Sequence, residues 1–175
     1  MRHGRTARMD AASRDIVSPS PDVTARLAAQ LGVWLGAGDV VLLSGPVGAG
    51  KSHFARALIQ SRLAALGRCE DVPSPTFTLV QSYDLGDVEL WHADLYRLSD
   101  THEIIELGLE QAFEEAICLV EWPERLGDLA PADALHLRLN VGEQEDARLL
   151  AFGSAAQKWQ TVLDALDPQA GVTHV

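Results

Sequence analysis

Cysteine is scarce in this sequence. Cys69 and Cys118 are the only two among 175 residues, and neither stands in a C-x-x-C arrangement. One lies in a polar segment and the other in an apolar run, so we expect neither a disulfide framework nor a zinc site. This cysteine usage fits a protein of the reducing cytoplasm best.

Long apolar runs are absent as well. No stretch approaches the roughly 18 to 20 apolar residues that a membrane-spanning helix needs, so we expect no membrane association. The first residues, MRHGRTARMDAASR, carry arginines but not the apolar segment of a secretory signal. We expect residues 1–16 to form a disordered tail.

Positive charge is also in short supply. Lysine and arginine number 14 against 25 acidic residues, which gives a net charge of −11 and a pI of about 4.8. Only two of the basic residues are lysines, Lys51 and Lys158. Because phosphate contacts need clustered basic side chains, such a chain is a poor independent binder of nucleic acid. If it serves RNA, we expect it to do so through a partner.

What the chain does contain is an alternation of helical and strand-like patterns. A helix is expected over 20–36, with Ser20 as its cap, Pro21 in its first turn, and Leu27, Leu31, Trp34 and Leu35 on its apolar face. Further helices are expected over 51–66, about 100–116 with a break near Gly108, and 154–166. Strands are expected over 39–44, within 72–83, and over 88–96, 117–121, 134–140 and 147–152.

This order of elements predicts an α/β fold. The strands within 72–83 and 88–96 read as an antiparallel hairpin, so the sheet should be mixed. Apolar residues make up 47% of the chain, and its length suits one domain, which we place at 17–167. Residues 168–175 are expected to be a frayed tail.

The segment GPVGAGKS, residues 45–52, matches the phosphate-loop pattern G-x-x-x-x-G-K-[ST] in full. It stands between a strand and a helix, as that loop requires. Its glycines let successive N–H groups turn inward, Lys51 can reach the β- and γ-phosphates, and the Ser52 hydroxyl can bind Mg²⁺. An ordinary strand–turn–helix corner is the alternative. The expected nucleotide-binding residues here are Gly45, Pro46, Val47, Gly48, Ala49, Gly50, Lys51, Ser52 and His53.

Two carboxylates follow apolar strands. Glu121 ends ICLVE, and Asp94 lies in WHADLY. Each one alone reads as a solvated charge at a strand end, but a Mg²⁺ site beside a phosphate loop needs an acidic group in such a place. His92, two residues before Asp94, is more simply a packed or hydrogen-bonded structural histidine than a general base.

Three classes of nucleotide chemistry compete with simple ATP hydrolysis. A GTPase is disfavoured because its N-K-x-D loop needs asparagine, and Asn140 is the only one. A small-molecule kinase stays open, although the arginines that could form a lid, such as Arg125, Arg138 and Arg148, are scattered. A non-catalytic nucleotide-sensing module also stays open.

Four segments in order, GPVGAGKS, SPTFTLV, HADLYRL and CLVEWPER, resemble the TsaE (YjeE) family over about 21–140. That family comprises bacterial ATPases supporting threonylcarbamoyladenosine (t6A) formation on tRNA. The resemblance implies a P-loop NTPase-like fold, a three-layer sandwich with a mixed, partly antiparallel sheet, that binds ATP and Mg²⁺. It implies an accessory ATPase, a monomer alone, that binds the TsaD–TsaB heterodimer, resets it by ATP hydrolysis and meets tRNA only indirectly.

The resemblance also carries roles onto individual residues. Lys51, Asp94 and Thr76 become the catalytic candidates: Thr76 would sense the γ-phosphate, and Asp94 would orient water or magnesium. Ser52, Glu121 and Asp94 become the magnesium candidates, and Trp122 is expected beside the nucleotide or partner. One departure is His53, which stands where the family commonly has a second threonine.

Overall fold

The computed structural model describes residues 10–170, and residues 1–9 and 171–175 lie outside this range. Within it, one mixed seven-stranded sheet has the order β1-β7-β6-β2-β5-β4-β3. The strands are β1 (Ala12–Ser18), β2 (Val40–Ser44), β3 (Val80–Asp84), β4 (Glu89–Asp94), β5 (Ile117–Glu121), β6 (Leu135–Val141) and β7 (Arg148–Ser154). The helices are α1 (Pro21–Trp34), α2 (Lys51–Ala64), α3 (Thr101–Glu106), α4 (Leu109–Glu115), α5 (Trp159–Ala165) and the 3₁₀ helix η1 (Pro123–Leu129).

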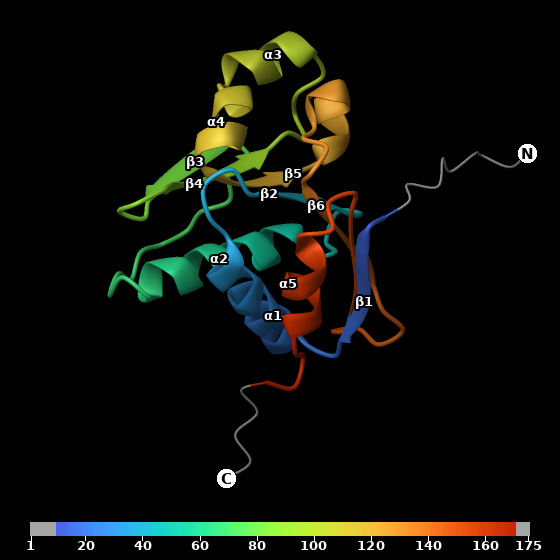
Figure 1. Cartoon of the computed structure of the whole chain (residues 1–175). Helices are drawn as coiled ribbons and strands as arrows, with labels where there is room; N and C mark the ends of the chain where they lie inside the picture. The colour runs from blue at the N-terminus through green and yellow to red at the C-terminus, as the bar shows by residue number, and fades with distance from the viewer. Residues whose placement is uncertain (1–9, 171–175) are drawn as a thin grey trace, which may run out of the picture.

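The sheet separates two layers of helices, which confirms the three-layer α/β sandwich (Figure 1). Helices α1, α2 and α5 share one hydrophobic core with one face of the sheet. Helices α3 and α4 and the 3₁₀ helix η1 share a second core with the other face. No helix within residues 10–170 has both the length and the apolar character needed to cross a membrane.

The centre of the sheet follows directly from two continuously apolar runs. β2 and β5 are buried along their length apart from the half-buried Ser44, and they pair in parallel. β6 and β4 extend this parallel centre on either side, and antiparallel pairing of β3, β7 and β1 completes the edges. The expected hairpin of β3 and β4 is therefore present. The carboxyl ends of β2, β4 and β5 meet at one edge of the sheet, where ligands bind in open α/β folds.

The amino-terminal part of the chain corrects one expectation. Residues 12–16, assigned to the disordered tail, belong to strand β1, which pairs antiparallel with β7. Ala12 and Ile16 point into the core, while the Arg14 guanidinium donates to the carbonyls of Leu163 and Leu166 at the end of α5. Charged residues interrupt the apolar alternation of this segment, so its pattern is weak in the sequence. The expectation for residues 1–9 lies outside the described range.

Of the helices on the phosphate-loop side, α1 and α2 begin where the sequence predicts. Ser20 caps α1 by accepting the Val23 N–H at 3.2 Å. The prediction that Trp34 lies in the core is wrong, because 47% of this residue is exposed. Leu27, Leu31 and Leu35 form the buried stripe, and Trp34 lies beside that stripe on the last turn of α1. α5 begins later than predicted because Ser154 still belongs to β7. Of the predicted tail at 168–175, only 168–170 are described, in a turn.

Candidate functional site

The predicted phosphate loop connects the end of β2 to the first turn of α2. Three of its glycines have positive φ: Gly45 at 138°, Gly48 at 81° and Gly50 at 103°. At Gly45 a side chain is also excluded by space, since a Cβ atom would stand 2.2 Å from the Leu139 carbonyl oxygen on β6. Glycine is thus required there for two separate reasons, and the loop lies tightly against the sheet.

A cavity of about 450 Å³ opens beside this loop. Ten of the predicted site residues line it: Val47, Gly48, Gly50, Lys51, Ser52, His53, Thr76, Asp94, Glu121 and Trp122. Gly45, Pro46 and Ala49 do not line it, although they shape the loop. Tyr96 lines the cavity as well and was not among the predicted residues. The structure therefore brings four sequence segments, far apart along the chain, to one hollow.

Lys51 lies at the base of the cavity and is buried. Its ammonium donates to the carbonyl oxygens of Gly45 at 2.6 Å and Pro46 at 3.0 Å. It also lies 4.2 Å from the centroid of the Trp122 ring, a cation–π distance. Burial lowers the pKa of Lys51, and the negative charges of Glu121, Glu124 and Asp94 partly oppose this effect.

The cavity wall above Lys51 is aromatic. Trp122 follows β5 with a φ of 59°, in the left-handed region that non-glycine residues rarely adopt. This backbone turn places its ring against that of Tyr96, with 4.9 Å between the ring centroids. The two rings and Lys51 form a continuous contact along one side of the site.

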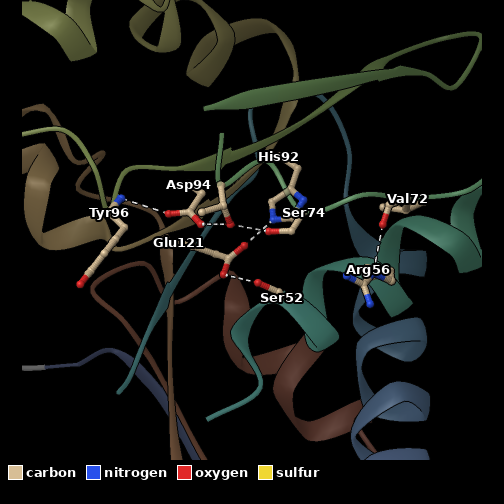
Figure 2. A network of polar contacts seen from close by, with 9 residues as sticks. Ser52, Arg56, Val72, Ser74, His92, Asp94, Tyr96 and Glu121 are labelled. Atoms are coloured by element: carbon tan, nitrogen blue, oxygen red, sulfur yellow. Dashed lines mark hydrogen bonds and ion pairs between the residues drawn. The ribbon is translucent and has the colours of Figure 1, made fainter. Parts of the chain in front are cut away.

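Two carboxylates face the cavity from neighbouring strands. Asp94 of β4 and Glu121 of β5 are partners in the parallel register, which explains why both reach the same edge. Asp94 accepts the Tyr96 N–H at 3.0 Å and the Thr76 hydroxyl at 3.3 Å. Glu121 accepts the Ser52 hydroxyl at 2.8 Å on one oxygen and contacts His92 Nε2 at 2.7 Å with the other (Figure 2).

Thr76 reaches Asp94 from an irregular segment rather than from a strand. Its hydroxyl shares a 2.8 Å hydrogen bond with Ser74, and the turn that contains it ends at Leu79, which has a φ of 69°. The Leu79 N–H donates to Pro75, and its carbonyl accepts the N–H of Asp94 at 2.9 Å. The segment is thus joined to β4 by one backbone hydrogen bond close to the carboxylate.

The donor set fits Mg²⁺ bound together with a nucleotide. Ser52, Glu121 and Asp94 supply one hydroxyl and two carboxylates, the hard oxygen ligands that this ion takes in proteins. Within residues 10–170 no group of three or more His, Cys, Asp or Glu side chains forms a complete cage. Mg²⁺ does not need one, since it keeps several waters and takes phosphate oxygens from the substrate.

His92 is a buried, hydrogen-bonded histidine, as expected, and its partner is the carboxylate predicted to bind metal. Its place two residues before Asp94 did not identify that partner. Sequence reasoning missed one further polar residue near the site. Arg148 is the first residue of β7. Nothing in its local sequence indicates that it binds Ala49 of the phosphate loop, 99 positions earlier.

Arg148 holds the phosphate loop from outside. Its Nε donates to the Ala49 carbonyl at 3.1 Å, and the same guanidinium donates to the carbonyls of Glu145 and Ala147 at 2.9 Å each. The Ala49 carbonyl and the Gly50 N–H belong to one trans peptide, so they point in opposite directions. Arg148 therefore favours the orientation in which the Gly50 N–H faces the cavity.

Substituting Arg148→Leu is expected to weaken ATP binding about 2- to 10-fold, the effect of losing one ordinary hydrogen bond of roughly 0.5–1.5 kcal/mol. Titration calorimetry of ATP binding checks this. Arg138→Leu is the matched control, because Arg138 lies on the adjacent strand β6 and lines a separate hollow that no residue of the phosphate loop lines. Equal losses in both variants would contradict a role of Arg148 in ordering the loop.

The sequence and the fold are similar to those of known proteins. The family model described as "Threonylcarbamoyl adenosine biosynthesis protein TsaE" matches residues 18–150. Curated proteins named tRNA threonylcarbamoyladenosine biosynthesis protein TsaE are similar to this chain. The one from Rickettsia felis is 32% identical over 85% of this chain and 92% of its own length. The one from Haemophilus influenzae is 39% identical over 72% of this chain and 77% of its own length.

A solved structure is similar as well. The crystal structure of YdiB from Bacillus subtilis superposes with a TM-score of 0.71 and 25% sequence identity, covering 88% of this chain and 93% of that one. The likeness extends over both helical layers and the sheet, so it is not limited to the phosphate loop.

Proposed function

This chain belongs to the TsaE family of threonylcarbamoyladenosine biosynthesis proteins, and from that premise we propose that it is the accessory ATPase of a t6A tRNA-modification system. The observation that carries the proposal is the convergence of Lys51, Ser52, Asp94 and Glu121 on one cavity beside a complete phosphate loop. Their elements meet at the sheet edge where nucleotides bind in such folds.

The residues divide the work of binding and hydrolysis. The loop N–H groups and the positive end of α2 receive the phosphates, and Lys51 exchanges the carbonyls of Gly45 and Pro46 for phosphate oxygens. Bound Mg²⁺ would neutralise charge on the β- and γ-phosphates, held by Ser52 and by Glu121 directly or through water. Asp94 orients the attacking water, and Thr76, hydrogen-bonded to Asp94, makes that orientation sensitive to the γ-phosphate.

The proposed partner is the TsaD–TsaB heterodimer, in the cytoplasm, with ATP hydrolysis resetting the heterodimer between catalytic cycles. A net charge of −11 supports indirect rather than direct contact with tRNA, because a phosphate backbone repels an acidic surface. Phe77 and Tyr96, exposed beside the cavity, lie where a partner could register the state of the nucleotide.

The test is steady-state ATP hydrolysis by the purified chain, alone and with an active TsaB–TsaD heterodimer from the same source. We expect slow hydrolysis alone, marked stimulation by the heterodimer and loss of both in Lys51→Ala. Absence of stimulation by a demonstrably active heterodimer would contradict the proposal.

Two further assays identify what such a failure means. ATP-dependent phosphorylation of a nucleoside or other metabolite, with no partner present, would favour a small-molecule kinase. ATP binding without hydrolysis in a single-turnover experiment with the heterodimer would favour a nucleotide-sensing module. Either result would contradict the proposed reaction but would still support nucleotide binding at this site.

A further inference from the structure

Glu121 is held at both oxygens. One accepts the Ser52 hydroxyl at 2.8 Å, and the other meets His92 Nε2 at 2.7 Å. The side chains of Glu121 and His92 are only 2% and 1% exposed, so water does not replace either contact. An ionised carboxylate buried this deeply is costly unless its oxygens are hydrogen-bonded. The site therefore depends on both partners of Glu121.

The two partners of Glu121 differ in kind. Ser52 belongs to the phosphate loop, and its hydroxyl is itself a predicted Mg²⁺ ligand. His92 belongs to the interior of β4, where it is opposite Leu119 in the register with β5. Ser52 can bind a ligand through an oxygen lone pair and still donate its O–H to one oxygen of Glu121, so its position depends on the ligand. His92 fixes the other oxygen of Glu121 from the interior of the sheet.

The second ring nitrogen of His92 supports a dedicated role. Nδ1 is buried and has no hydrogen-bond partner within residues 10–170. A carboxylate only accepts hydrogen bonds, so Nε2 is the protonated nitrogen and its N–H donates to Glu121. The ring thus leaves one acceptor unsatisfied and makes its single described hydrogen bond to Glu121. A histidine kept for general hydrogen bonding in the core would be expected to use both nitrogens.

We propose that His92 is a positioning residue that fixes the Glu121 carboxylate in the orientation needed to bind Mg²⁺ together with a nucleotide. The inference rests on the proposed function, because it assumes that Mg·ATP is the ligand. His92 does not line the cavity and acts through Glu121 alone. Partners of metal-binding carboxylates in this position typically change metal affinity or activity about 10- to 100-fold when they are removed.

Three variants separate positioning from packing. His92→Gln keeps an N–H donor at about the reach of Nε2, whereas the amide of His92→Asn is too short to reach Glu121. His92→Leu keeps apolar volume and removes the donor. A packing role predicts that the leucine variant behaves best, and a positioning role predicts that the glutamine variant does. His102→Leu, an exposed histidine at the start of α3, is the matched control.

The measurement is the ATP dissociation constant by titration calorimetry, once with Mg²⁺ and once with EDTA, together with thermal unfolding of each variant. We expect His92→Leu and His92→Asn to lose about tenfold or more of the affinity that Mg²⁺ adds, with binding in EDTA changed less than about twofold. His92→Gln should recover most of the loss. If the leucine variant does not fold, the glutamine–asparagine comparison decides.

Several results would overturn the inference: an unchanged Mg²⁺ contribution in the asparagine variant, equal losses with Mg²⁺ and with EDTA, or no rescue by glutamine. A wild-type chain that binds ATP no better with Mg²⁺ overturns it as well. Failure of the proposed function looks different. A wild-type chain that binds Mg·ATP but shows no partner-stimulated hydrolysis refutes that function, while the affinities of the His92 variants still decide the inference.

Discussion

Lys51→Ala is expected to weaken ATP binding on the order of 10- to 100-fold, the effect of losing one hydrogen bond to a charged group, which contributes about 1.5–3 kcal/mol. Lys51 is the cation at the base of the cavity, and its two loop carbonyl contacts are ones that phosphate oxygens can replace. Alanine supplies neither charge nor donor. Titration calorimetry with Mg·ATP measures the change, and ATP hydrolysis at sub-saturating ATP should fall with it.

Loss of binding in this variant should not come from unfolding. Burial lowers the pKa of Lys51 in the folded chain below its usual value of 10.5. The unfolded chain therefore holds this proton more tightly, so the buried ammonium costs stability at neutral pH, and the cost fades only as the pH rises towards 10.5. Alanine removes this cost together with the two carbonyl hydrogen bonds and the contact with Trp122, so without nucleotide we expect Lys51→Ala to change the unfolding temperature little.

The chain offers a matched control for this substitution. Lys158 is the only other lysine, half-exposed, and pairs with Asp39 at 3.1 Å, away from the phosphate loop. Lys158→Ala removes the same charge and should leave ATP affinity unchanged. Equal affinity in Lys51→Ala and Lys158→Ala would mean that the phosphate loop does not bind ATP through this lysine.

Asp94→Asn is expected to lower the rate of ATP hydrolysis about 10²- to 10⁴-fold, the range typical of a side chain that handles a proton or orients the attacking group. Binding should change far less. The amide oxygen can still accept the N–H of Tyr96, and the amide NH2, in place of the second oxygen, can donate to the hydroxyl of Thr76, so the wall of the cavity is preserved. The negative charge beside Glu121 is what disappears.

Single-turnover hydrolysis at saturating Mg·ATP, with and without the partner, measures this effect separately from affinity. Asp87→Asn is the control, since Asp87 is an exposed carboxylate at the far end of the same β3–β4 hairpin. Wild-type turnover in Asp94→Asn would remove this carboxylate from the mechanism and leave Glu121 as the acidic group to test next.

The parts of the fold that sequence predicts well are those with unbroken local signals. VVLLS and ICLVE are continuously apolar and became the parallel centre of the sheet, and the glycines between β2 and α2 mark a loop that only glycine can form at residue 45. The parallel register of β4 and β5 brings Asp94 beside Glu121. The sequence places each carboxylate at the end of a strand but does not show that the two strands are neighbours.

Long-range partners are what sequence does not show. β1 is stabilised by β7, more than a hundred residues later, and by carbonyls at the end of α5 that bind Arg14, so its own interrupted pattern suggests a tail. Arg148 reaches the phosphate loop only because β7 returns beside β6. Trp34 shows the opposite error, a residue predicted to be buried that is exposed. Helical spacing alone assigned this residue of the last turn of α1 to the core.

Leu79 and Trp122 are the two non-glycine residues with positive φ between residues 10 and 170. Trp122 lines the cavity, and the Leu79 carbonyl accepts the N–H of Asp94, which lines it as well. Each such conformation costs about 1–3 kcal/mol, a noticeable share of the roughly 5–15 kcal/mol that keeps a domain folded. The backbone conformations of Leu79 and Trp122 thus lower the free energy of unfolding at the edge of the sheet where the candidate site lies. Selection for heat resistance alone would relax the backbone at these positions first, and ATP affinity would decline before the fold did.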